Sequence, residues 1–148
     1  MADKLEFYLS FPGTAAKAAK FYTEIFGVEA VSMKFKDFPP EEGMEGFDPE
    51  LIGHASIPFD NADLMFSDGY QSVAPHGEDF SIAWTTNDEV RYHDVWKKFM
   101  AADVKVIDEP APTFWAQLFG RVTDPFGFTW LLMYVDLNAP QFTIEAPK

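Results

Sequence analysis

The sequence predicts an α+β fold made of two βαβββ modules with curved sheets. Strand-like and helix-like segments follow one another in the order β-α-β-β-β, and this order occurs twice. The segment FYLSF at 7–11 matches FSIAW at 80–84, and FYTEIFG at 21–27 matches VWKKFMA at 95–101, with shifts of 73 and 74 residues. Few residues are identical, but the apolar positions agree, which indicates a repeated module within a single domain over residues 1–148.

The first module is predicted over about residues 4–68. Its opening strand, 4–11, stops at Pro12-Gly13, and Thr14 can cap the helix that follows over 15–26. Apolar residues recur along this helix at helical spacing, and Gly27 ends it. The strand that closes the module ends at Asp68, which is predicted to cap a turn. The remaining elements are strands at 28–35, 51–59 and 62–68, with an acidic, proline-containing loop at 37–50.

The second module is predicted over about residues 80–136, between a polar linker at 69–79 and a C-terminal tail at 137–148. A strand at 80–85 leads into a helix that Asn87 or Asp88 caps and that ends near residue 102. The spacing of the apolar residues predicts that four side chains of this helix point inward: Val90, Val95, Trp96 and Phe99.

An aromatic-rich hairpin completes the second module. A short strand at 104–107 and a loop marked by Pro110 and Pro112 precede it. The hairpin covers 115–136 and turns at 124–127, with the sequence Asp-Pro-Phe-Gly. Pro presets the backbone angle of the first central position of such a turn, and Gly supplies a positive φ. Strands rich in Trp, Phe, Val and Leu suit a half-buried sheet.

Aromatic side chains are unusually abundant in an otherwise ordinary composition. Hydrophobic residues make up 47% of the chain and charged residues 24%, as in globular proteins, but aromatic residues reach 17% and include sixteen Phe. Some of these rings are expected to line a cavity or a subunit interface, although a Phe-rich core would account for them equally well.

The net charge of −13 excludes some partners. Repulsion opposes binding to nucleic acid or to an anionic membrane, although an acidic surface can attract a cationic ligand. The chain has no Cys, so disulfides are excluded and zinc could be held only by His and carboxylates. The N-terminus lacks a signal-peptide pattern, and no apolar run approaches the roughly twenty residues of a membrane span. A cytoplasmic location is therefore expected.

The chain resembles the vicinal oxygen chelate superfamily, which includes glyoxalases, bleomycin-resistance proteins and extradiol dioxygenases, and within it the PhnB-like branch. The matching segments are AAKAAKFYTEIFG, GHASIPFDNADLMFSD, VWKKFMAADVKVIDEP and FWAQLFGRVTDPFGFTWLL, which together cover most of residues 4–133. The resemblance implies paired βαβββ modules whose curved mixed sheets lie around a cleft, each sheet forming half of it, in a homodimer. It also implies a divalent metal bound by His and Glu side chains on the first and last strands of the modules. This metal polarises oxygens of the substrate.

The metal ligands of the superfamily have no counterpart at the corresponding positions of this chain. These positions fall near Phe7 and Ser81 on the first strands, near Met65 or Phe66, and near Leu131 on the last strands. None of these side chains is a ligand for a divalent metal, so no metal and no other cofactor is expected. A register slip of one residue would bring Glu6 into place, but it would also reverse the faces of the strand.

Two polar residues are candidates for chemistry. His54 lies in a predicted strand and matches a histidine common in the PhnB-like pattern. It is the candidate catalytic residue, as a general base or as a partner for a polar group of a ligand. A hydrogen-bonded histidine at a sheet surface is the alternative. Arg121 can bind a carboxylate or phosphate, or can form a surface ion pair. His76 and His93 are predicted to be exposed to solvent.

The resulting hypothesis is a PhnB-like protein that binds a small organic ligand in an aromatic cleft without a metal. One alternative is a divergent metalloenzyme of the lyase, isomerase or dioxygenase type that uses unusual ligands such as Glu6 and His54. Another is a fold that serves mainly in association. Methyl transfer is not expected, because no Gly-rich loop follows the first strand to hold S-adenosylmethionine. The candidate ligand-binding residues are Phe7, Met65, Ser81, Trp84, Trp115, Arg121 and Leu131.

Overall fold

The computed structural model describes residues 4–39, 46–69 and 80–140. The chain divides into two compact units, Met1–Ala74 and Pro75–Lys148, and each is described by itself. The boundary between them falls within the segment 69–79, which the sequence marks as a linker. His76, which the sequence predicts to be exposed, lies outside the described residues, and so does the segment 141–148 of the predicted tail.

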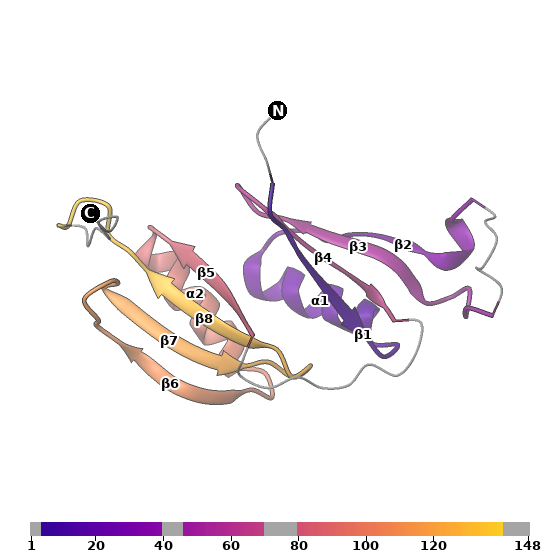
Figure 1. Ribbon diagram of the computed structural model, residues 1–148. Helices are drawn as coiled ribbons and strands as arrows, with labels where there is room; N and C mark the ends of the chain where they lie inside the picture. The colour runs from indigo at the N-terminus through magenta and orange to yellow at the C-terminus, as the bar shows by residue number, and fades with distance from the viewer. Residues whose placement is uncertain (1–3, 40–45, 70–79, 141–148) are drawn as a thin grey trace, which may run out of the picture. The chain divides into compact units, whose positions relative to one another are not determined.

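Unit 1 is a βαβββ module with a four-stranded mixed sheet (Figure 1). The strand order is β1-β4-β3-β2, in which β1 pairs with β4 in parallel and the other pairs are antiparallel. Its elements are β1 (Phe7–Phe11), α1 (Ala15–Phe26), β2 (Val31–Lys34), the short 3-10 helix η1 (Phe35–Asp37), β3 (Ile52–Pro58) and β4 (Asp63–Asp68).

Unit 2 repeats this arrangement with the strand order β5-β8-β7-β6. Here β5 pairs with β8 in parallel, and the remaining pairs are antiparallel. Its elements are β5 (Ser81–Thr86), α2 (Glu89–Met100), β6 (Lys105–Ala111), β7 (Leu118–Thr123) and β8 (Thr129–Tyr134). The two units confirm the predicted α+β fold with two βαβββ modules and mixed sheets. The cleft between the sheets stays a prediction.

Several local predictions need correction. The second strand is shorter than 28–35, because Phe35 already belongs to η1. The loop predicted around Pro110 is wrong, since β6 runs to Ala111. Pro110 is tolerated there because β6 is an edge strand, where a missing N–H breaks no ladder. Val90 was predicted to point inward but is 80% exposed, whereas α2 buries Tyr92, Val95 and Phe99.

Each helix covers one face of the sheet in its own unit. In unit 1 the ring of Tyr22 on α1 packs edge-on against Phe66, and Phe66 packs against Phe11. In unit 2 Phe99 on α2 contacts Trp130 of β8. Figure 1 shows α1 behind its sheet. Because the helices bury only one face, each sheet keeps a second face that no helix of its unit covers.

A buried carboxylate fixes the start of α1. Thr14 was predicted to cap this helix, but its side chain makes no cap hydrogen bond. Instead Asp68, which is 1% exposed at the end of β4, accepts the backbone N–H groups of Ala15 and Ile52, both at 2.9 Å. Asp68 therefore joins the helix, β3 and β4 at one point.

Asp124 fixes the hairpin turn of unit 2. Its Oδ1 atom accepts the backbone N–H groups of Phe126 and Phe128, at 2.9 and 3.0 Å. Gly127 adopts a φ of +91°, as the predicted turn requires. The Asp-Pro-Phe-Gly sequence thus forms the turn that it predicts.

Within the described residues, no helix has both the length and the apolar character that crossing a membrane would need.

Candidate functional site

The helix-free face of unit 2 collects four of the predicted ligand-binding residues. Paired residues of neighbouring strands share a face, and side chains alternate between faces along each strand. Leu131 of β8 pairs with Ala83 on one side and with Arg121 on the other. Trp130 and Leu132, the neighbours of Leu131 along β8, point to the opposite face and are buried against α2. The helix-free face of unit 2 is formed by Ser81, Ala83, Phe119, Arg121, Leu131 and Met133, with Trp115 beside it.

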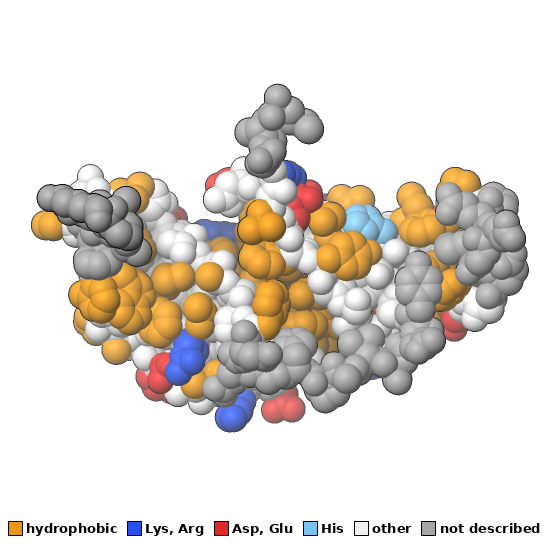
Figure 2. Space-filling view, viewed as in Figure 1, with side chains coloured by type: hydrophobic (Ala, Val, Ile, Leu, Met, Phe, Trp, Pro, Cys, Tyr) orange, Lys and Arg blue, Asp and Glu red, His pale blue; other side chains and the backbone are white. Residues whose placement is uncertain are grey.

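Three aromatic rings form a partly exposed cluster at one end of this face. The ring centroid of Trp115 lies 4.7 Å from that of Phe114 and 5.4 Å from that of Phe119, in both cases edge to face. Phe114 is 71% exposed and Trp115 is 42% exposed. Figure 2 shows hydrophobic side chains gathered over the loop between β6 and β7. We call Phe114, Trp115 and Phe119 the aromatic cluster.

A short turn holds the loop that carries the cluster. The backbone N–H of Thr113 donates to the carbonyl of Ala116 at 3.0 Å, and the hydroxyl oxygen of Thr113 accepts the N–H of Ala116 at 3.1 Å. Ala116 itself is 4% exposed and anchors the loop in the unit. The two exposed rings are thus held at the surface by an ordered backbone.

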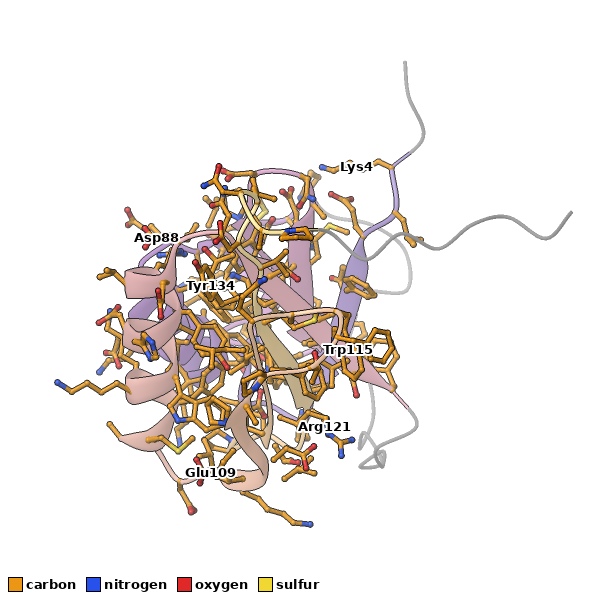
Figure 3. All side chains as sticks on the ribbon, turned by 90° about the vertical axis from the view of Figure 1, so that its left-hand side faces the viewer. Lys4, Asp88, Glu109, Trp115, Arg121 and Tyr134 are labelled. Atoms are coloured by element: carbon orange, nitrogen blue, oxygen red, sulfur yellow. The ribbon has the colours of Figure 1, made fainter. Side chains whose placement is uncertain are left out.

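Arg121 lies on the same face and forms an ion pair. Its Nε atom donates to Oδ2 of Asp108 at 2.5 Å. This is the ion pair that the sequence analysis gave as one of two possible roles of Arg121. Within residues 4–39, 46–69 and 80–140, its two Nη groups make no hydrogen bond. Figure 3 shows Arg121 and Trp115 on the side of the sheet away from α2. The ion pair orients the guanidinium and leaves one edge of it available.

The helix-free face of unit 1 carries His54 and Met65. Met65 of β4 pairs with Tyr8 of β1 on one side and with Ser56 of β3 on the other. His54 lies two residues before Ser56 on β3 and therefore on the same face. The hydroxyl of Tyr8 lies 3.2 Å from Nδ1 of His54, and the two rings are 5.8 Å apart. We call this contact the Tyr8–His54 pair.

Phe7 and Trp84 do not share these faces. Phe7 pairs with Leu64, a core residue that is 4% exposed, so its ring points toward the helix side of the sheet. Trp84 is 8% exposed, and the guanidinium of Arg91 lies 5.7 Å from its ring centroid, in a cation–π contact. The position that faces away from α1 on β1 is Tyr8, which the sequence interpretation missed.

The metal site of the superfamily is not supported by the residues present. The helix-free face of unit 1 carries the carboxylates of Glu6 and Asp63, but the ammonium of Lys4 lies 2.5 Å from Glu6 and 3.8 Å from Asp63. The hydrogen bond to Glu6 raises the pKa of Lys4, which keeps this counter-charge in place. The described part of the chain contains no group of three or more His, Asp or Glu that could hold a metal. The donor set therefore does not fit a divalent metal.

Comparisons with known proteins agree with the two-module fold. The model of the Glyoxalase/Bleomycin resistance protein/Dioxygenase superfamily matches residues 4–132. Protein YjdN of Escherichia coli strain K12 is 30% identical over 144 residues, which cover 90% of this chain and 97% of that protein.

Two solved structures have the same fold over nearly their whole length. The crystal structure of protein PA1353 from Pseudomonas aeruginosa superposes with a TM-score of 0.74 at 26% identity, over 90% of this chain and 98% of that one. A PhnB protein from Bacillus cereus, named as a putative 3-demethylubiquinone-9 3-methyltransferase, gives 0.69 at 21% identity, over 90% and 100%. Because the family match spans both βαβββ modules, this chain belongs to the glyoxalase/bleomycin resistance protein/dioxygenase superfamily.

Proposed function

We propose that this protein binds a small organic molecule with a planar apolar surface, without a metal, on the helix-free face of unit 2. The observation that carries the proposal is the aromatic cluster, because two of its three rings are held exposed by an ordered loop. Keeping large apolar rings in contact with water is unfavourable, and exposed apolar patches commonly mark binding sites. A ligand that covers the rings would remove this surface from water.

The neighbouring side chains give the face a polar end. Phe119 and Arg121 are two residues apart on β7, so their side chains stand next to each other on the same face. Leu131 and Met133 pair with them on β8 and extend the apolar surface. A planar ligand can thus pack on the ring and the apolar side chains while a polar group accepts hydrogen bonds from the Nη groups of Arg121.

Methyl transfer is not part of this proposal, although the similar PhnB protein from Bacillus cereus is named as a putative methyltransferase. Only Pro12, Gly13 and Thr14 lie between β1 and α1, so no Gly-rich loop surrounds a cofactor there. A metal-dependent reaction would need ligands that the described residues of the helix-free faces do not supply.

Binding can be tested with three aromatic probes that differ in charge: indole, benzoate and benzamidine. We expect at least one of them to raise the melting temperature in proportion to its concentration and to shift the indole N–H signal of Trp115 in NMR spectra. Trp115→Ala should abolish the rise in melting temperature. Val90→Ala is the matched control, since Val90 is an exposed apolar residue on α2. Binding that persists unchanged in Trp115→Ala would contradict the proposed site.

The metal-free part of the proposal has its own test. Elemental analysis of the purified protein after incubation with Zn²⁺, Ni²⁺ or Mn²⁺ should give far less than one ion per chain. A stoichiometric ion, lost in Glu6→Gln or His54→Ala, would instead support the divergent metalloenzyme.

We also propose that the protein is a cytoplasmic homodimer that binds neither nucleic acid nor membranes. The net charge of −13 supports the last two points, and the superfamily resemblance supports the dimer. Sedimentation analysis over a range of concentrations tests the dimer, and a monomer at all concentrations would refute it.

A further inference from the structure

The Tyr8–His54 pair spans the central part of the sheet in unit 1. Tyr8 lies on β1 and His54 on β3, and β4 runs between these two strands. The two side chains therefore reach over β4 from both sides to make their 3.2 Å contact. Ser67 of β4 lies two residues after Met65, on this same face, and is 8% exposed. The imidazole is thus held at a defined place on the face.

The chemistry of the two groups decides which of them donates. A phenol hydroxyl is a good donor and a weak acceptor, whereas an unprotonated imidazole nitrogen is a good acceptor. These preferences favour the tautomer with the ring proton on Nε2, in which the hydroxyl of Tyr8 donates to Nδ1 of His54. Nε2 has no hydrogen-bond partner among the described residues. The pair thus presents an unused N–H donor.

We propose that Nε2–H of His54 is the hydrogen-bond donor of a second ligand site, on the helix-free face of unit 1, and that this site binds a neutral carbonyl oxygen. The neutral imidazole acts there as a donor and not as a base, because Tyr8 occupies one nitrogen and the proton occupies the other. Met33, the partner of His54 on β2, and Met65 of β4 supply apolar contact for the rest of the ligand.

The charges around the pair favour a neutral ligand over an anion. Lys4, Glu6 and Asp63 sum to −1, and Lys34, Lys36 and Glu50 sum to +1, so these groups of the unit provide no excess of positive charge. The chain as a whole carries −13. An anionic ligand would meet repulsion that a single neutral N–H donor does not offset. A carbonyl oxygen accepts the same hydrogen bond without this penalty.

NMR of protein with 15N-labelled histidine tests both parts of the proposal. Without ligand, the ring nitrogens of His54 at neutral pH should show the Nε2–H tautomer, and Tyr8→Phe should increase the share of the other tautomer. Titration with acetophenone should shift the Nε2 signal of His54, whereas benzoate should leave it unchanged. Trp115→Ala should not alter the effect of acetophenone on His54. A negative result for the His54 site can therefore be distinguished from a negative result for the proposed site on unit 2.

Two substitutions at His54 distinguish a hydrogen-bond donor to the ligand from a residue that only stabilises the fold. The side-chain amide of Gln can place an N–H close to the position of Nε2, whereas Ala supplies none. We expect His54→Ala to weaken acetophenone binding by about tenfold and His54→Gln by only about twofold, from the usual range for one neutral hydrogen bond. Backbone amide spectra check that both variants fold.

Three results would overturn the proposal. The first is an Nδ1–H tautomer in the unliganded protein, which would make Nε2 a base. The second is a shift of the His54 ring signals by benzoate that equals or exceeds the shift by acetophenone. The third is no response of His54 to acetophenone at millimolar concentration.

Discussion

The indole N–H of Trp130 donates to Oδ2 of Asp124 at 2.9 Å, directly beneath the turn between β7 and β8. Both residues are buried, with exposed fractions of 1% and 4%. The other carboxylate oxygen accepts the two N–H groups of the turn. One side chain therefore connects the hairpin turn to a fully buried indole ring of the unit 2 core.

Asp124→Asn should destabilise the protein by about 2 to 3 kcal/mol. The amide keeps one oxygen for the turn, but its NH₂ group then faces the indole N–H, so a buried donor loses its acceptor. Urea unfolding followed by circular dichroism measures the change. Asp103→Asn is the control, because Asp103 is exposed and should change stability by less than about 0.5 kcal/mol. Equal effects of the two substitutions would contradict the role of Asp124 as an acceptor.

Asp68→Ala and Thr14→Ala should differ strongly, although Thr14 occupies the cap position of α1. Asp68→Ala removes the acceptor of two buried N–H groups and should cost about 2 to 4 kcal/mol. Thr14→Ala should cost less than about 0.5 kcal/mol, below the ~1 kcal/mol typical of a capping Thr, since its side chain makes no cap hydrogen bond. Hydrogen exchange of the first turn of α1 should quicken only in Asp68→Ala. A large effect of Thr14→Ala would refute the assignment.

Gly120→Ala should destabilise unit 2 because α2 packs closely on β7. A Cβ atom at Gly120 would lie 2.7 Å from the ring of Trp96 and 3.3 Å from the carbonyl oxygen of Asp108. Such overpacking costs about 1 to 3 kcal/mol. Trp96→Leu makes room for the methyl group, so the double variant should lose less stability than the sum of the single variants. Strict additivity would show that the ring does not limit the space.

Stability should fall at alkaline pH through Tyr92. Burial on α2 raises the pKa of Tyr92 to about 12, from 10.0, and its hydroxyl donates to the carbonyl of Leu132 at 3.3 Å. The folded state thus binds this proton more tightly than the unfolded state. Its contribution is complete below pH 10 and is lost as the pH rises from about 10 to about 12.

Thermal unfolding as a function of pH measures this effect. In Tyr92→Phe the decline in melting temperature between pH 10 and about 12 should be shallower, even though the variant loses a hydrogen bond at neutral pH. Parallel curves for the two proteins would contradict the assignment of the alkaline loss to Tyr92.

The sequence predicted the two modules because their signals are local. Helical spacing, alternating apolar residues and the Asp-Pro-Phe-Gly turn each depend on residues a few positions apart, and the structure retains all of them. Val90 was counted in the apolar spacing of α2, although it lies five residues before Val95 and so does not fit the i, i+3, i+4 pattern. Its 80% exposure shows that position on the helix, rather than side-chain type, decides burial.

The candidate site was harder to predict because it depends on strand faces. In a strand, an error of one residue exchanges the buried and the outer face. The sequence interpretation treated Phe7 and Ser81 as equivalent positions of the two modules, which are 74 residues apart. The matching segments FYLSF and FSIAW are only 73 residues apart. The shift of 73 aligns Leu9 with Ile82 and Phe11 with Trp84, all of them buried. An alignment with the shift of 73 makes Tyr8 the equivalent of Ser81, and so would have identified Tyr8 as the residue of β1 on the helix-free face.

The Tyr8–His54 pair had no signal in the sequence. The two residues are 46 positions apart and on strands that are not neighbours in the sheet. Their contact follows from the strand order β1-β4-β3-β2, which alternating polarity does not encode. The same holds for Asp68, whose hydrogen bond to Ala15 joins residues 53 positions apart.

The two buried carboxylates imply an order of events during folding. The hydrogen bonds of Asp124 span only two to six residues, so they can form as soon as the hairpin closes. The bonds of Asp68 span 16 and 53 residues and require that distant segments have already met, which loop-closure entropy slows. We therefore expect the β7–β8 hairpin to be an early nucleus and the start of α1 to become protected last.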